Sequence, residues 1–224
     1  MGCQGQEILK EFEGIDFDAK VIKLVHILNE RKINHEWRES CHGRRTEYYV
    51  GDEVVLALVL YPDKKTYIPV VVERWFYDTY LSDGNGSLCI NGRKKNDYRV
   101  RISRNGVFGS IPLHRAVMQK SIKEFTKQDN KEICVDHKYH CVWINTSDGL
   151  RLCTVEQNNN NRSNCKTVDA SNEFAYDAGK DFTYTWYGYV LHKMLGMCTW
   201  EELEEYNRTY NNTHTRGNKI GREV

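Results

Sequence analysis

The stretch from Ile133 to Asn161 holds residue types that suit phosphodiester hydrolysis. Asp136 and Asn158 offer a carboxylate and an amide oxygen, hard ligands that suit Mg²⁺ or Mn²⁺ and leave positions for water and phosphate. The imidazole of His137 can take a proton from an attacking water near physiological pH. Because side chains alternate along a regular strand, His137 is expected to point away from an ion held by Asp136. Taken alone, the Asp136-His137 dipeptide has an alternative interpretation, in which the histidine has a purely structural role.

The elements around these residues are expected to bring the two oxygen ligands together. Residues Ile133 to His137 and Leu150 to Val155 are strand-like, and Glu156 begins a polar stretch that can start a short helix. A strand–loop–strand–helix unit sets the end of its first strand opposite the helix. The sequence therefore predicts that Asp136 and Asn158 share one metal ion.

Three separated motifs keep one order through this stretch. They are Val135-Asp136-His137, Leu150-Arg151-Leu152-Cys153-Thr154 and Gln157-Asn158. These motifs resemble those of the HNH, or ββα-metal, nucleases, especially the phage and intron-encoded homing endonucleases. They occur in the same order as in that family, and no gap is needed to match them. Leu113-His114-Arg115-Ala116-Val117 also resembles the Leu-His-Arg helix start upstream of the site in that family. The resemblance covers roughly Tyr98 to Arg162.

The resemblance implies a role for each matching residue. His137 would be the general base that activates water, while Asp136 and Asn158 would hold the catalytic Mg²⁺ or Mn²⁺. His114 and Arg115 would brace the site or touch the DNA backbone, with helix packing as the equal alternative. The implied partner is double-stranded DNA, and no small-molecule cofactor is expected.

The sequence departs from the family pattern at two places in the loop before the second strand. Gly149 stands where the family usually has an asparagine whose side chain ties down the loop, and Asn145 or Asp148 is expected to replace that tether. Residues 139–141 read Tyr-His-Cys where Asp-Gly-Asn is common, so the loop must close differently. An alternative interpretation follows, in which Gly149 marks a disarmed site in a DNA-binding or regulatory protein.

A basic segment precedes the proposed site. Between Asn91 and Cys134 there are eleven basic and four acidic residues, a difference of +7, while the whole chain has a formal net charge of +1. A local phosphate-binding surface is therefore expected, with an ordinary solvated face as the alternative. The predicted DNA contacts are Arg93, Lys94, Lys95, Arg99, Arg101 and Arg104. Alternation over Tyr98 to Ile102 and the Asn105-Gly106 turn predict a hairpin.

The whole chain is predicted to have an α+β fold with three parts. Residues 1–90 form an N-terminal α/β extension, 91–165 the ββα-metal nuclease core with its basic hairpin, and 166–224 a C-terminal helical extension. In the first part, Asp18 is expected to cap a helix, and Glu53 to Tyr61 pairs with Thr66 to Glu73 as a hairpin.

Two helices are predicted in the C-terminal part. They run roughly from Tyr184 to Leu195 and from Thr199 to Tyr210. Thr199-Trp200-Glu201-Glu202 has the form of a capping box, in which a threonine and a glutamate three residues later satisfy each other's backbone amides. Both helices are predicted to pack against the core.

Composition limits the remaining functional classes. The mean hydropathy is -0.68, and no apolar run approaches the length that spans a bilayer. The N-terminus lacks the build of a signal peptide, so an intracellular, cytoplasmic protein is expected. No CxxC pair occurs among the eight cysteines, which weakens a zinc interpretation. Structural zinc on Cys134, His140, Cys141, Cys153 and Cys165, in an interaction protein without nuclease activity, is the remaining alternative.

Overall fold

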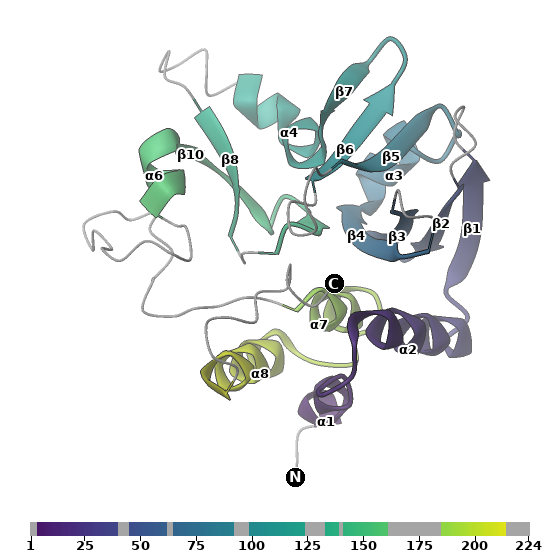
Figure 1. Ribbon diagram of the computed structural model, residues 1–224, viewed down its shortest axis with the longest axis vertical. Coiled ribbons are helices and arrows are strands. Elements are labelled where there is room, and N and C mark those ends of the chain that lie inside the picture. Colours follow the sequence, from purple (N-terminus) through teal and green to yellow (C-terminus); the bar gives the residue numbers. More distant parts are fainter. Residues whose placement is uncertain are drawn as a thin grey trace.

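The computed structural model describes residues 4–39, 45–61, 65–91, 99–123, 133–138, 141–160 and 185–213. Over these residues the fold is α+β, with three separate sheets (Figure 1). Helices α1, α2, α7 and α8 lie together on one side of the largest sheet, and the smaller sheets lie on the other. Of the helices in the described ranges, none combines the length and apolar character needed to cross a bilayer.

The largest sheet has five strands in the order β1-β2-β3-β4-β9. Their bounds are Asn34–Glu39 (β1), Arg45–Val50 (β2), Val54–Leu60 (β3), Tyr67–Glu73 (β4) and Ile144–Asn145 (β9). The predicted hairpin is confirmed as the antiparallel pair β3–β4. Both strands are buried along nearly their whole length, which explains their continuous runs of Val, Ile and Leu. The short strand β9 joins this sheet parallel to β4.

Four helices cover this sheet: α1 (Gln4–Lys10), α2 (Phe17–Glu30), α7 (Trp186–Lys193) and α8 (Trp200–Thr213). The predicted cap of α2 was wrong by two residues. Asp16 is the N-cap and accepts from the Ala19 amide at 2.7 Å, while Asp18 lies in the first turn. The capping box of α8 is confirmed, with Thr199 N to Glu202 Oε2 at 2.8 Å and Glu202 N to Thr199 Oγ1 at 3.2 Å.

A second sheet carries the predicted basic hairpin. It consists of β5 (Gly86–Asn91), β6 (Arg99–Arg104) and β7 (Phe108–Pro112), all antiparallel neighbours. Gly106 adopts a φ of +76° at the turn between β6 and β7, as an Asn-Gly turn requires. The boundary predicted after residue 90 falls inside β5, which pairs with β6.

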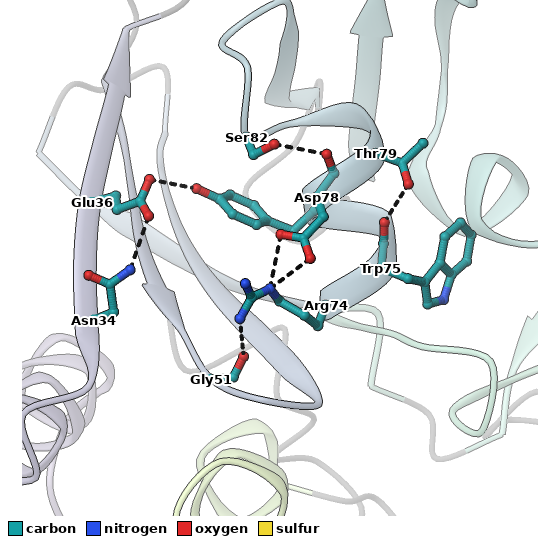
Figure 2. A network of polar contacts seen from close by, with 9 residues as sticks. Asn34, Glu36, Gly51, Arg74, Trp75, Asp78, Thr79 and Ser82 are labelled. Carbon is teal, nitrogen blue, oxygen red and sulfur yellow. Dashed lines mark hydrogen bonds and ion pairs between the residues drawn. The ribbon is translucent and has the colours of Figure 1, made fainter.

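Helix α3 (Arg74–Tyr80) is held against the large sheet by polar contacts (Figure 2). The Tyr77 hydroxyl donates to Glu36 on β1 at 3.0 Å. Arg74 donates to the carboxylate of Asp78 at 2.9 Å and to the Gly51 carbonyl oxygen at 3.2 Å. These bonds fix the direction in which the chain leaves β4.

The remaining elements form a strand–strand–helix unit. Strands β8 (Ile133–His137) and β10 (Leu150–Thr154) pair antiparallel, and α6 (Val155–Asn160) follows directly. Gln157 and Thr154 satisfy each other's backbone amides at 2.8 and 3.2 Å, which starts α6 as a capping box does. The predicted order of elements around the chemistry-bearing residues is therefore observed.

One more helix lies beside this unit. Helix α4 (Leu113–Val117) begins directly after β7, and residues 119–123 are also helical. The spacing of Val117, Ile122 and Phe125 predicts a helix from His114 to about Phe125; it is present as far as residue 123, apart from a turn at Met118, and Phe125 lies outside the described residues.

Candidate active site

His137, at the end of β8, meets residues from two other elements. Its Nε2 lies 3.4 Å from Oδ1 of Asn145 on β9. Its ring lies edge-on to the ring of His114 on α4, with centroids 5.2 Å apart. Three of the residues singled out from sequence therefore converge, although 8 and 23 residues separate the two neighbours from His137 along the chain.

The orientation of Asn145 determines which nitrogen of His137 carries a proton. Asn145 is 1% exposed, and its Nδ2 donates to the Val142 carbonyl oxygen at 3.2 Å. Its Oδ1 is therefore the atom that faces His137, and an oxygen acceptor needs the hydrogen on Nε2. The neutral ring then has its basic lone pair on Nδ1, the form a general base requires.

Asp136 lies in an ion pair with Arg151, the residue directly across on β10. Two guanidinium nitrogens contact Oδ2 of Asp136, Nε at 2.9 Å and Nη2 at 2.8 Å. The side chains of Asp136 and Arg151 are only 12% and 13% exposed. Sequence reasoning did not assign a role to Arg151. Its signal was the strand register, which pairs positions 136 and 151 once the ends of both strands are known.

The side chains of Asp136 and His137 lie on opposite faces of the β8–β10 pair. His137 contacts α4 and β9, and Val135 and Leu150 on the same face join the main core. Asp136 lies on the other face because neighbouring residues of a strand alternate. Figure 1 shows the β8–β10 pair between α4 and α6, and α6 contacts both strands.

Asn158 belongs to α6 and is partly buried. With Asp136, it offers one carboxylate and one amide oxygen, from the two contacting elements β8 and α6. Hard oxygen donors of this kind fit Mg²⁺ or Mn²⁺, and a third or fourth ligand can be water or phosphate. The donor chemistry of the chain thus fits the expected ion.

The loop between β9 and β10 contains one of the two departures from the family pattern, Gly149; of the other, at residues 139–141, the structure describes Cys141 alone. A Cβ added at Gly149 would lie 2.8 Å from Ile144 Cγ2 and 3.0 Å from Thr146 Oγ1. The close packing of the loop therefore excludes an asparagine there without rearrangement. The carboxylate of Asp148 accepts from Tyr189 on α7 at 2.7 Å and ties the loop to that helix.

The predicted DNA contacts are only partly described. Arg93, Lys94 and Lys95 lie outside the described residues, and Arg99 begins β6. Arg101 donates from Nε to Ser110 Oγ at 3.0 Å, and Arg115 is exposed on α4. Arg104 forms a two-pronged pair with Asp83, at 2.9 and 2.7 Å. Arg104 thus has a structural partner that joins β6 to the turn before β5.

Two cysteines of the zinc interpretation, Cys141 and Cys153, are buried. Burial raises the pKa of both thiols to about 12, so without a metal ion both are protonated at neutral pH. Within the described ranges no group of three His, Cys, Asp or Glu side chains is arranged to hold a metal ion. His140 and Cys165 lie outside those ranges.

Comparisons with known proteins give no relative. No family model, curated protein or solved structure matches this chain. What the site does is therefore inferred from its own residues and their geometry.

Proposed function

We propose that this chain is a metal-dependent endonuclease of the HNH type, which hydrolyses phosphodiester bonds in double-stranded DNA. One observation carries the proposal. A histidine at the end of β8 is hydrogen-bonded to a buried asparagine, in a strand–strand–helix unit that has Asp136 next to this histidine on β8 and Asn158 on the helix. Metal-assisted phosphodiester hydrolysis uses a general base and a metal ion at one phosphate, so a phosphate bound at the end of β8 would have to reach both faces of the strand pair.

The described residues divide the chemistry between the two faces. His137 takes the proton of the attacking water on Nδ1, and Asn145 holds the ring by accepting from Nε2. Asp136 and Asn158 are the ligands we assign to Mg²⁺ or Mn²⁺, and Arg151 fixes the direction of the Asp136 carboxylate. The bound ion would stabilise negative charge on the phosphate and the leaving oxygen.

The test is cleavage of supercoiled plasmid DNA in the presence of Mg²⁺. The variant His137→Ala is expected to lose at least about a hundredfold in cleavage rate, because general-base catalysis supplies that much or more. Its affinity for DNA should stay close to that of the unchanged protein. His26→Ala is the matched control, because His26 is an exposed histidine on α2 whose only described ion pair is with Glu30. It should cut normally.

Two other results would count against the proposal. Equal cleavage by the unchanged protein and His137→Ala would show that the base is elsewhere. Binding of DNA without cleavage by the unchanged protein, with Mg²⁺ or Mn²⁺ present, would favour the disarmed, DNA-binding alternative. Removal of the ion with a chelator should stop cleavage reversibly.

A further inference from the structure

The loop that follows Asn145, the partner of His137, has little regular structure of its own. It runs from Thr146 to Gly149, between the two-residue strand β9 and β10. Gly149 N donates to the Thr146 carbonyl oxygen at 3.0 Å, and Lys138 N donates to the Gly149 carbonyl oxygen at 3.0 Å. These backbone bonds close the loop on itself and on the end of β8. Contacts from other elements fix its position in the molecule, and one of them is the hydrogen bond that Ser147 Oγ donates to Glu73 at the end of β4.

Tyr189 of α7 supplies that attachment. Its side chain is fully buried, and its hydroxyl donates to Asp148 Oδ1 at 2.7 Å. The same oxygen lies 2.9 Å from Thr146 Oγ1. One phenol oxygen thus holds two residues of the loop.

A second residue of α7 reinforces this attachment. Lys193, one helical turn after Tyr189, lies 3.3 Å from the Asp148 carboxylate and 3.5 Å from that of Glu53. Lys138, the residue after His137, donates from Nζ to the Asp148 carbonyl oxygen at 2.9 Å. The attached loop therefore adjoins the histidine–asparagine pair on both sides, at Asn145 and at Lys138.

We infer that Tyr189 is a positioning residue for His137. Through Thr146 and Asp148 its buried hydroxyl fixes the loop next to Asn145, and with it the hydrogen bond that orients the imidazole. A shift of the loop lengthens the contact between Nε2 and Oδ1, which is 3.4 Å in this structure. The ring then loses its single orientation and its preference for the hydrogen on Nε2. The effect on cleavage rests on the proposed function, whereas the effect on the ring does not.

The test compares Tyr189→Phe with Tyr187→Phe. Both tyrosines are buried in α7, but the Tyr187 hydroxyl bonds to the Tyr206 hydroxyl on α8, at 3.0 Å. The first readout is the ¹⁵N spectrum of the histidine rings, in which the His137 signals are identified by their loss in His137→Ala. Tyr189→Phe should shift or broaden the His137 signals, and Tyr187→Phe should leave them in place.

The second readout is cleavage of plasmid DNA. Tyr189→Phe should lower kcat by roughly ten- to a hundredfold, since small misplacements of a reacting group have effects of that size. The affinity for DNA should be unchanged, and so should cleavage by Tyr187→Phe. If Tyr189→Phe does not fold, Asp148→Ala removes the same bond from its half-exposed end and should shift the same signals.

The outcomes separate the inference from the proposed function. Unchanged His137 signals in Tyr189→Phe, or equal changes in both variants, would overturn the inference even if the unchanged protein cuts DNA. If that protein does not cut DNA, the proposed function fails. A His137 shift confined to Tyr189→Phe would still uphold the positioning role.

Discussion

Asp136 is held by Arg151 before any metal ion is considered. The guanidinium contacts Oδ2 through two nitrogens and is itself shielded from solvent. A buried carboxylate needs such a partner because removing a lone charge from water is costly. The same contact prevents the carboxylate from rotating freely. Arg151 thus serves both the stability of the fold and the direction of a proposed metal ligand.

Substitution of Arg151 should be costly for this reason. Arg151→Met keeps the length of the side chain but leaves Asp136 without its guanidinium, so the free energy of unfolding should fall by about 3 kcal/mol. Urea unfolding measures this loss. Arg74→Met, which removes an exposed pair with Asp78 and a bond to the Gly51 carbonyl oxygen, is the comparison and should cost less than Arg151→Met.

A double variant makes this prediction sharper. Adding Asp136→Asn to Arg151→Met removes the charge that was left in place, so part of the lost stability should return. If the double variant is as unstable as the sum of its two single variants, the pair does not act as the geometry indicates.

At the scale of elements, Gly149 decides how the loop after β9 closes. The Cβ contact of 2.8 Å with Ile144 requires a movement of β9, because Ile144 lies within that strand. We expect Gly149→Ala to lower the free energy of unfolding by about 1–3 kcal/mol, as overpacking does. Gly109→Ala, on β7 with open space at the added Cβ, is the control and should not destabilise the protein.

A substitution at Gly149 also tests the alternative interpretation, in which the site has lost its catalytic activity. If Gly149 marked a lost catalytic tether, Gly149→Asn would increase cleavage of plasmid DNA. The packing of the loop predicts the reverse, a less stable protein with no gain in cleavage rate.

Sequence reasoning succeeded where the signal was local. The Asn105-Gly106 turn, the Thr199 capping box and the strand–strand–helix order each depend on residues within a few positions of one another. It failed for pairings across long distances. The parallel contact of β9 with β4 joins positions 144–145 to 71–72, and the side chains of β9 give no local sign of it. The register that pairs Arg151 with Asp136 was also out of reach.

The candidate site shows the same division. His137, Asn145 and His114 were named from sequence, and the structure brings them together. Tyr189 was missed because its hydroxyl acts across the fold, 41 residues from Asp148 along the chain. The residues around Tyr189 are typical of a helix that packs against the core, so composition and spacing did not mark Tyr189 as a site residue.

At the scale of the whole molecule, the C-terminal helices pack against the elements that carry the candidate site. Phe12 of the segment after α1 stacks on Tyr187 of α7 at 4.5 Å between ring centroids. Trp143, just before β9, packs edge-on against Trp186 at 6.5 Å. The loop between β9 and β10 contacts α7 as well, and Asp148 is the charged residue at this junction.

The stability of the protein should depend on pH through this junction. Burial tends to raise the pKa of Asp148, but hydrogen bonds from Thr146 and Tyr189 and the charge of Lys193 outweigh it, so the pKa lies below its ordinary value. A carboxyl with a lowered pKa in the folded state stabilises that state above the unfolded pKa, near 3.9 for aspartate, by roughly the difference in proton affinity. That contribution disappears as the pH falls through the folded value.

Asp148→Asn should therefore be less stable than the unchanged protein from about pH 5 upward, and the difference should shrink below about pH 4. Urea unfolding across pH 2.5 to 7 measures it. Asp52→Asn, an exposed position in the turn between β2 and β3, is the control and should change stability little at any pH. A difference for Asp148→Asn that is constant over the whole range would mean that the carboxylate acts through its shape alone. The negative charge would then contribute nothing to holding the loop on α7.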